Sequence, residues 1–178
     1  QCSVGFPIEM RVGGNSVLDE QLPLRPSVFC AGGIGVSPIL SQYREFLFLR
    51  DKTDAASGSP DANVTVDTAP TMFLYTVSST TELVFGSELA ELSHQGSQLG
   101  HDKMVFALTQ NKESLDSRDI PSHVPCRTGR VLADFLNDAP HDANFYICGP
   151  PSMIDDAVNH LTNIRAIPQE RIYYEKWW

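Results

Sequence analysis

Short apolar runs alternate with segments of helical periodicity along most of this 178-residue chain. Five runs have the length and composition of buried strands: 28–31, 72–77, 104–108, 143–148 and 172–174. The first four are each followed by a segment with apolar residues at helical spacing: 39–47, 83–92, 130–136 and 153–164. Strands that alternate with helices form a parallel sheet, because each connection must cross a face of the sheet to reach the next strand. The expected fold is α/β, a doubly wound, five-stranded, Rossmann-like parallel sheet with helices on both faces.

Two segments depart from this pattern. Residues 6–12 alternate apolar and polar side chains, as a half-buried strand does, and a loop with two prolines joins them to residue 27. Residues 51–70 are polar, contain Pro, Gly, Ser and Asp, and show no periodicity. We therefore expect a short segment at 1–26 ahead of one domain at 27–178, with a mobile surface insertion at 51–70.

Composition and charge narrow the class of partner. The net charge is −9, and nucleic-acid binding needs clustered positive charge, so no nucleic-acid partner is expected. No apolar run is long enough to span a membrane, and no cysteines have the spacing of a zinc or iron–sulfur site, so neither a transmembrane segment nor a metal is expected. Cys30 and Cys148 end apolar runs, which favours reduced thiols in an intracellular protein. The chain begins at Gln1 without a signal segment, which suggests an excised fragment.

A glycine-rich loop joins the first strand to the first helix. Its sequence is Ala31-Gly32-Gly33-Ile34-Gly35-Val36-Ser37-Pro38. Glycines there would let the backbone approach a pyrophosphate closely. Ser37 suits an N-cap and Pro38 suits the first helical turn, so the helix amides would face the ligand. Pro38 stands where the usual dinucleotide pattern has a third glycine, and a plain strand-to-helix turn is the alternative.

A second strand-to-helix loop has the same context. Its sequence is Cys148-Gly149-Pro150-Pro151-Ser152-Met153. Because both loops follow strands of one parallel sheet, we expect them on the same rim, where Cys148 would present its thiol. A buried structural cysteine is the alternative.

These two loops, together with the ending Tyr174-Glu175-Lys176-Trp177-Trp178, resemble the ferredoxin–NADP reductase superfamily. Members carry a Gly-Gly-x-Gly-x-(Ser/Thr)-Pro loop, a Cys-Gly-Pro-x-x-Met loop and a closing Glu near an aromatic residue. The resemblance covers residues 4–178 apart from 51–70, and the tail Glu-Lys-Trp-Trp points to a mitochondrial type within the superfamily. The implied location is intracellular, either mitochondrial or cytoplasmic.

The resemblance assigns both loops to a nicotinamide nucleotide. The family's pyrophosphate and nicotinamide loop matches Gly32, Gly33, Gly35, Ser37 and Pro38. The family's loop on the nicotinamide side matches Cys148, Gly149, Pro150 and Met153. In the family that cysteine lies beside the carbon that gives up hydride, so Cys148 is expected to be catalytic.

Further assignments follow from the same resemblance. Glu175 and Trp177 match residues near the flavin ring, where catalytic roles are expected, and Trp178 joins the cofactor-binding set. Ser78 lies within 76–80, which matches the region that reads the adenosine ribose. Family members bind flavin on a separate amino-terminal barrel. The strand at 6–12 looks like the last strand of that barrel, so 1–26 would be its remnant plus a linker.

The implied function is that of the nicotinamide-nucleotide-binding module of an FAD-dependent oxidoreductase. The full-length protein would pass hydride from NAD(P)H to FAD and electrons onward to an unknown acceptor, and the fragment alone would be inactive. NAD is expected in preference to NADP, because Glu82 would repel a 2′-phosphate, although Lys112 or Arg118 could approach it. The alternative is a nucleotide-sensing or interaction domain without turnover.

Overall fold

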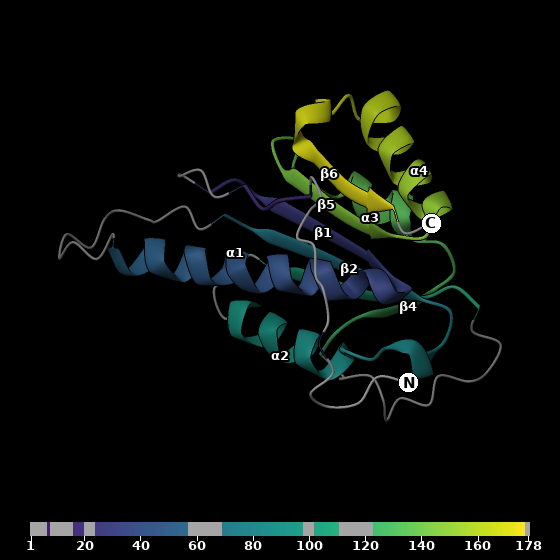
Figure 1. Ribbon diagram of the computed structural model, residues 1–178, viewed down its shortest axis with the longest axis horizontal. Coiled ribbons are helices and arrows are strands. Elements are labelled where there is room, and N and C mark those ends of the chain that lie inside the picture. Colours follow the sequence, from purple (N-terminus) through teal and green to yellow (C-terminus); the bar gives the residue numbers. More distant parts are fainter. Residues whose placement is uncertain are drawn as a thin grey trace.

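The computed structural model describes residues 7, 16–19, 24–56, 69–97, 102–110 and 123–176. At their centre is a six-stranded sheet in which every pairing is parallel (Figure 1). The strands are β1 (Ser27–Gly32), β2 (Thr71–Val77), β3 (Lys103–Leu108), β4 (Cys126–Thr128), β5 (Asn144–Gly149) and β6 (Ile172–Lys176). Their order across the sheet is β4-β3-β2-β1-β5-β6. The predicted α/β class is confirmed, with six strands instead of five.

β4 is the strand that the sequence did not predict. It has three residues and pairs with β3 alone among the described strands. None of its side chains is fully buried. A strand at the sheet edge packs against one neighbour only, so it needs no apolar run, and the sequence carries no signal for it.

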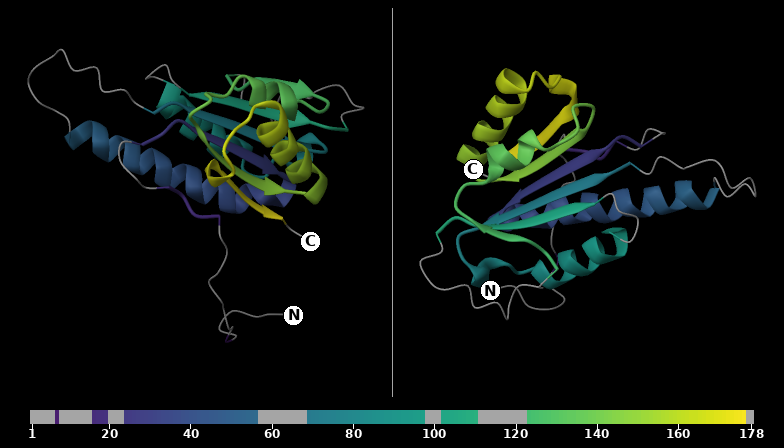
Figure 2. Two further views of the ribbon diagram at one scale, coloured as in Figure 1. Left: turned by 90° about the horizontal axis from the view of Figure 1, so that it is seen from above. Right: turned by 180° about the vertical axis from the view of Figure 1, so that it is seen from behind.

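Helices cover both faces of the sheet, as predicted. They are α1 (Val36–Ala56), α2 (Gly86–Ser97), α3 (Leu132–Asn137) and α4 (Pro151–Asn159), which continues as a π-helical turn at His160–Ile164. One core layer joins Phe29 to Tyr43 of α1 and Leu89 of α2, while the other joins Val28 to residues of α3 and α4. Figures 1 and 2 show α1 and α2 on one side of the sheet and α3 and α4 on the other. Within the described residues, no helix is both long and apolar enough to cross a membrane.

The strand order reverses at β1. From β1 the chain moves outward through β2, β3 and β4, and then β5 returns to the opposite side of β1. The two loops singled out in the sequence follow β1 and β5, so they meet where the order reverses. In doubly wound sheets, ligands bind outside the carboxyl ends of the strands at this point.

The expected insertion at 51–70 begins later than predicted. α1 continues through Ala56, so its last residues were mistaken for loop because they lack a clear apolar stripe. Ala69 is buried ahead of β2. Residues 57–68 lie outside the described part of the chain, as does the strand expected at 6–12 apart from Pro7.

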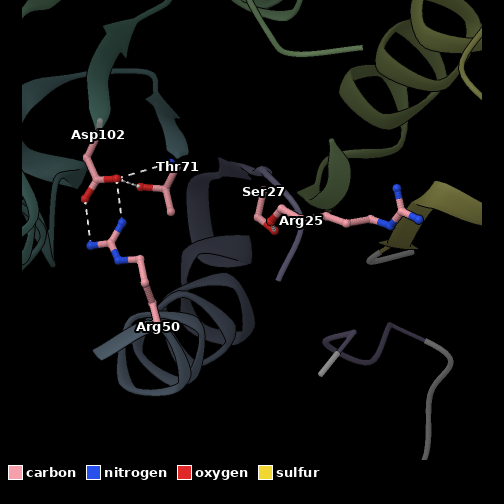
Figure 3. Close-up of polar contacts among 5 residues, drawn as sticks. All are labelled: Arg25, Ser27, Arg50, Thr71 and Asp102. Carbon is pink, nitrogen blue, oxygen red and sulfur yellow. Dashed lines mark hydrogen bonds and ion pairs between the residues drawn. The ribbon is translucent and has the colours of Figure 1, made fainter. Parts of the chain in front are cut away.

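A buried ion pair ties the amino ends of the strands to α1 (Figure 3). The Arg50 guanidinium donates two hydrogen bonds to Asp102, with Nη1 to Oδ1 at 2.8 Å and Nη2 to Oδ2 at 3.0 Å. The Thr71 hydroxyl and amide also donate to Asp102 Oδ1, at 2.6 and 3.1 Å. The two charged side chains are 4% and 2% exposed. This contact holds α1, β2 and β3 at the end of the sheet opposite the two loops.

Candidate functional site

The two loops interlock through their glycines. A Cβ atom at Gly35 would lie 2.3 Å from the carbonyl oxygen of Cys148, and one at Gly149 would lie 3.0 Å from the Cα atom of Gly32. A Cβ atom at Gly32 would lie 2.6 Å from the Sδ atom of Met153. At Gly35 this distance to backbone is shorter than real Cβ atoms show, at Gly149 it is at the tight limit, and at Gly32 the overlap is with side chains of the other loop. These glycines are therefore needed for packing between the loops, and their predicted contact with a ligand stays a prediction.

Gly33 differs from the other loop glycines. Its φ is +54°, in the left-handed region that favours glycine, and a Cβ atom there would meet no atom within 4 Å. The 3-10 turn Gly33–Gly35 leads directly into α1, whose first-turn amides carry a partial positive charge at this edge of the sheet. Gly33 thus combines open space with a backbone that an anion can approach, which fits the predicted pyrophosphate contact.

A cleft of about 560 Å³ opens beside Gly33. It lies between the loop after β1, the end of β2, the start of α3 and one side of α4. Five of the predicted cofactor-binding residues line it: Gly32, Gly33, Ser78, Pro150 and Met153. Its volume lies in the range typical of sites for small molecules and cofactors.

Glu82 shapes the loop after β2. The Ser78 amide donates a hydrogen bond to Oε2 of Glu82 at 3.1 Å, and the Tyr75 hydroxyl donates to the Glu82 carbonyl oxygen at 3.0 Å. Burial, and after it the charge of Glu82, raises the pKa of Tyr75 to about 12, so this hydroxyl remains a donor at neutral pH. Ser78 and Glu82 both line the cleft. A carboxylate therefore stands in the region that the resemblance assigns to the adenosine ribose.

Arg130 is a lining residue that the sequence analysis missed. It follows Gly129, which has a φ of +88° and whose amide donates to the carbonyl oxygen of Leu108 at 2.8 Å. Within the described part of the chain, Arg130 is the only Lys or Arg that lines the cleft. The sequence offered one indication of this role, which is that Arg130 directly follows the turn at Gly129. A dinucleotide carries negative phosphates, so this cation suits the ligand that the loops predict.

Cys148 and Glu175 lie next to each other in the sheet, on the side away from the cleft. They are paired in the register of β5 and β6, and neither lines the cleft. Cys148 is 1% exposed and belongs to the same core layer as Tyr146, because residues two apart on a strand share a face. The thiol is therefore covered, contrary to its expected presentation on the rim. Glu175 is exposed.

Ser37 and Pro38 also stay outside the cleft lining. α1 starts at Val36, directly after the 3-10 turn, so Ser37 is its second residue and not its N-cap. Pro38 is the third residue and lies in the first turn, as expected. Four further candidates lie outside the described residues and stay predictions: Lys112, Arg118, Trp177 and Trp178.

Comparison with known proteins places the chain in a family. The model of the oxidoreductase NAD-binding domain matches residues 29–159. The chain belongs to this family. Oxidoreductase NAD-binding domain-containing protein 1 of Danio rerio is 30% identical over 185 residues, a match that covers 100% of this chain and 62% of that protein.

Solved structures share the fold. Flavohemoglobin from Malassezia yamatoensis, with bound FAD and heme, has a TM-score of 0.61 and 22% identity, over 92% of this chain and 33% of that one. A ferredoxin NADP+ reductase from Neisseria gonorrhoeae, with bound FAD and NADP, has a TM-score of 0.55 and 22% identity, over 86% of this chain and 56% of that one.

These matches confirm the predicted ferredoxin–NADP reductase superfamily. Within that superfamily, the Glu-Lys-Trp-Trp tail had pointed to one type of protein. The relatives called oxidoreductase NAD-binding domain-containing protein are of this type. The chain spans between 54% and 62% of the length of these relatives. The activity of the whole protein is therefore a proposal.

Proposed function

We propose that this chain is the nicotinamide-nucleotide-binding half of a flavin reductase, which passes hydride from NAD(P)H to FAD. The observation that carries the proposal is the placement of Gly33. It presents open, positive-φ backbone to a cleft at the reversal point of a doubly wound sheet, beside the start of α1. Family membership and the FAD-containing structural neighbours support the same reaction class.

The chain's part in that reaction is to bind and orient the nucleotide. Gly33 and the first amides of α1 would hold the pyrophosphate, and Ser78 and Arg130 would meet the adenosine end. The nicotinamide would then extend toward the loop after β5, with Pro150 and Met153 beside it. When bound, nicotinamide and flavin supply the hydride chemistry, while the protein supplies their relative geometry. The roles of Cys148 and Glu175 near the reacting atoms stay part of this proposal, as does an intracellular location.

The preferred nucleotide in this proposal is NAD(H). Glu82 places a carboxylate at the end of β2 and holds the Ser78 amide, which a 2′-phosphate would otherwise be able to use. A 2′-phosphate bound there would lose that amide and approach a negative charge. The positive charge of Arg130 attracts the phosphates of both nucleotides, so it does not add to the preference for NAD(H).

The burial of Cys148 favours a second function, which is nucleotide binding without turnover. The resemblance implies a thiol beside the nicotinamide, and in the described conformation this thiol is covered. Anaerobic addition of NADH to the purified native protein that contains this chain separates the two functions. Rapid loss of the absorbance of oxidised, protein-bound flavin after NADH is added supports the reductase. Saturable NADH binding to a protein that holds no flavin, or whose flavin stays oxidised, supports the sensing domain.

A further inference from the structure

Residues 16–19 form a strap across the α1 face of the domain. The Leu18 side chain is buried in the core layer beneath α1. The Asp19 amide donates a hydrogen bond to the Tyr146 hydroxyl at 2.9 Å, and Nδ2 of Asn144 donates to Oδ2 of Asp19 at 3.1 Å. At the other end, Nε2 of Gln42 donates to the Ser16 carbonyl oxygen at 2.7 Å. A four-residue segment is thus held by α1 and β5, which are more than 20 residues away in sequence.

The anchors of the strap belong to the rigid centre of the sheet. Tyr146 is fully buried, and its ring stacks on Tyr173 of β6 at 5.1 Å and on Phe29 of β1 at 5.2 Å between ring centroids. Asn144 is 3% exposed. Two of the strap's contacts are made by backbone atoms of Ser16 and Asp19, so the anchors fix the path of the chain as well as one side chain.

The strap is anchored on the same face of the sheet as Cys148 and Glu175. Tyr146 and Cys148 are two residues apart on β5, and Tyr173 and Glu175 occupy the matching positions on β6. Asp19 is therefore anchored to Asn144 and Tyr146, the two residues of β5 that precede Cys148 on the same face of the sheet. The strap thus fixes residues 16 and 19 on the α1 face of the sheet.

We propose that the strap is a positioning device, with Tyr146 as its key positioning residue. By fixing residues 16–19, it sets the orientation of the domain that precedes them against Cys148 and Glu175. The inference rests on the proposed function, since it assigns that preceding domain to flavin. Tyr146 contacts neither ligand in this account. Its hydroxyl acts through the Asp19 amide, so its loss should alter the geometry of hydride transfer while nucleotide binding stays the same.

The experiment compares Tyr146→Phe with Tyr43→Phe in the native protein that contains this chain. Both variants remove one buried tyrosine hydroxyl on the α1 side of the sheet, but the Tyr146 hydroxyl accepts from the strap, whereas the Tyr43 hydroxyl bonds to Thr71. Hydrogen exchange at the Asp19 amide should become about fivefold faster or more in Tyr146→Phe and stay unchanged in Tyr43→Phe. The rate of flavin reduction at saturating NADH should fall about tenfold in Tyr146→Phe alone, with the Kd for NADH unchanged within about twofold. Gln42→Leu, at the other end of the strap, provides a second test with the core intact.

Two results would overturn the proposal. One is an Asp19 amide that exchanges rapidly in the wild-type protein, because the strap would then not form in solution. The other is a normal rate of flavin reduction in Tyr146→Phe and Gln42→Leu, although their strap amides exchange faster. A native protein without flavin would contradict the proposed function, because there would be no flavin domain to position. Slow exchange of the Asp19 amide in that protein would still show that the strap itself forms.

Discussion

The glycines of the two loops perform different tasks, although the sequence shows them as one motif. Gly32, Gly35 and Gly149 sit where a methyl group would collide with the opposite loop. Gly33 sits where a methyl group would point into open space beside the cleft. The sequence predicted that glycines are needed here. Which of them pack against the other loop and which one faces the cleft depends on how closely β1 and β5 bring the loops together.

Gly35→Ala should destabilise the fold. Its Cβ atom would lie 2.3 Å from the Cys148 carbonyl oxygen, so one of the loops must move. We expect a loss of about 2–3 kcal/mol in the free energy of unfolding. Urea denaturation measures it, with Gly86→Ala as the control, because a Cβ atom at Gly86 would make only ordinary contacts of 3.4 Å or more. Equal stability of the two variants would show that the loops are not packed as described.

Glu82→Gln should weaken the discrimination against NADP(H). Gln keeps an oxygen that accepts the Ser78 hydrogen bond but removes the negative charge from the exposed end of the cleft. We expect the affinity for NADP(H) to rise about threefold to tenfold and the affinity for NAD(H) to stay nearly constant. Parallel titrations with both nucleotides measure the ratio of the two Kd values. An unchanged ratio would remove Glu82 from the specificity of the site.

At the scale of elements, the sequence predicted the interior of the sheet better than its margins. The buried strands carry their own apolar runs, and the helices that follow them carry an apolar face, so both were predictable. β4 was not, because a three-residue edge strand gains its place from pairing with β3. The end of α1 was not, because its polar composition resembles a loop. The contacts of Arg50 with Asp102 were invisible for a similar reason, since they join elements 52 residues apart.

Asp102→Asn should destabilise the fold strongly. It would leave the buried Arg50 guanidinium without its counter-charge, and breaking one side of a buried ion pair costs about 3–5 kcal/mol. The matched control is Asp138→Asn, which removes an exposed ion pair with Lys103 and should change stability much less, because water and salt screen surface charges. Thermal and urea denaturation of both variants measure the difference. Similar small losses in both would mean that the buried pair contributes no more than a surface pair.

At the scale of the whole molecule, topology and the location of the cleft followed from the order of the elements. The alternation of strands and helices predicted a doubly wound sheet, and such a sheet predicts a site at its reversal point. The walls of the cleft could not be predicted, because Arg130 reaches it from beyond β4 and Cys148 turns away from it into the core. The strap at 16–19 was equally hidden, since side chains far away in sequence hold it largely through the backbone atoms of Ser16 and Asp19.

The fold should lose stability at alkaline pH through its buried tyrosines. Burial raises the pKa of Tyr43, Tyr75 and Tyr146 from the ordinary value of 10.0 to about 12. The unfolded chain therefore releases these protons first. The free energy of unfolding should be unaffected by these groups below pH 10 and fall between pH 10 and 12, by up to about 3 kcal/mol per tyrosine. Burial also raises the pKa of Tyr173, so ultraviolet absorbance should show at least three of the five tyrosines titrating late, and simultaneous titration of all five in the folded state would contradict this.

Calorimetric titration of this chain with NADH shows whether the cleft beside Gly33 binds a nicotinamide nucleotide. Gly33→Ala and Gly129→Ala form a matched pair, because both glycines have positive φ and free space for a methyl group, but only Gly33 lines the cleft. Each variant should lose about 1–2 kcal/mol of stability. We expect one saturable NADH site in the wild-type chain, with an affinity that falls about tenfold or more in Gly33→Ala and stays unchanged in Gly129→Ala. A folded wild-type chain without saturable binding, or equal weakening in both variants, would contradict this expectation.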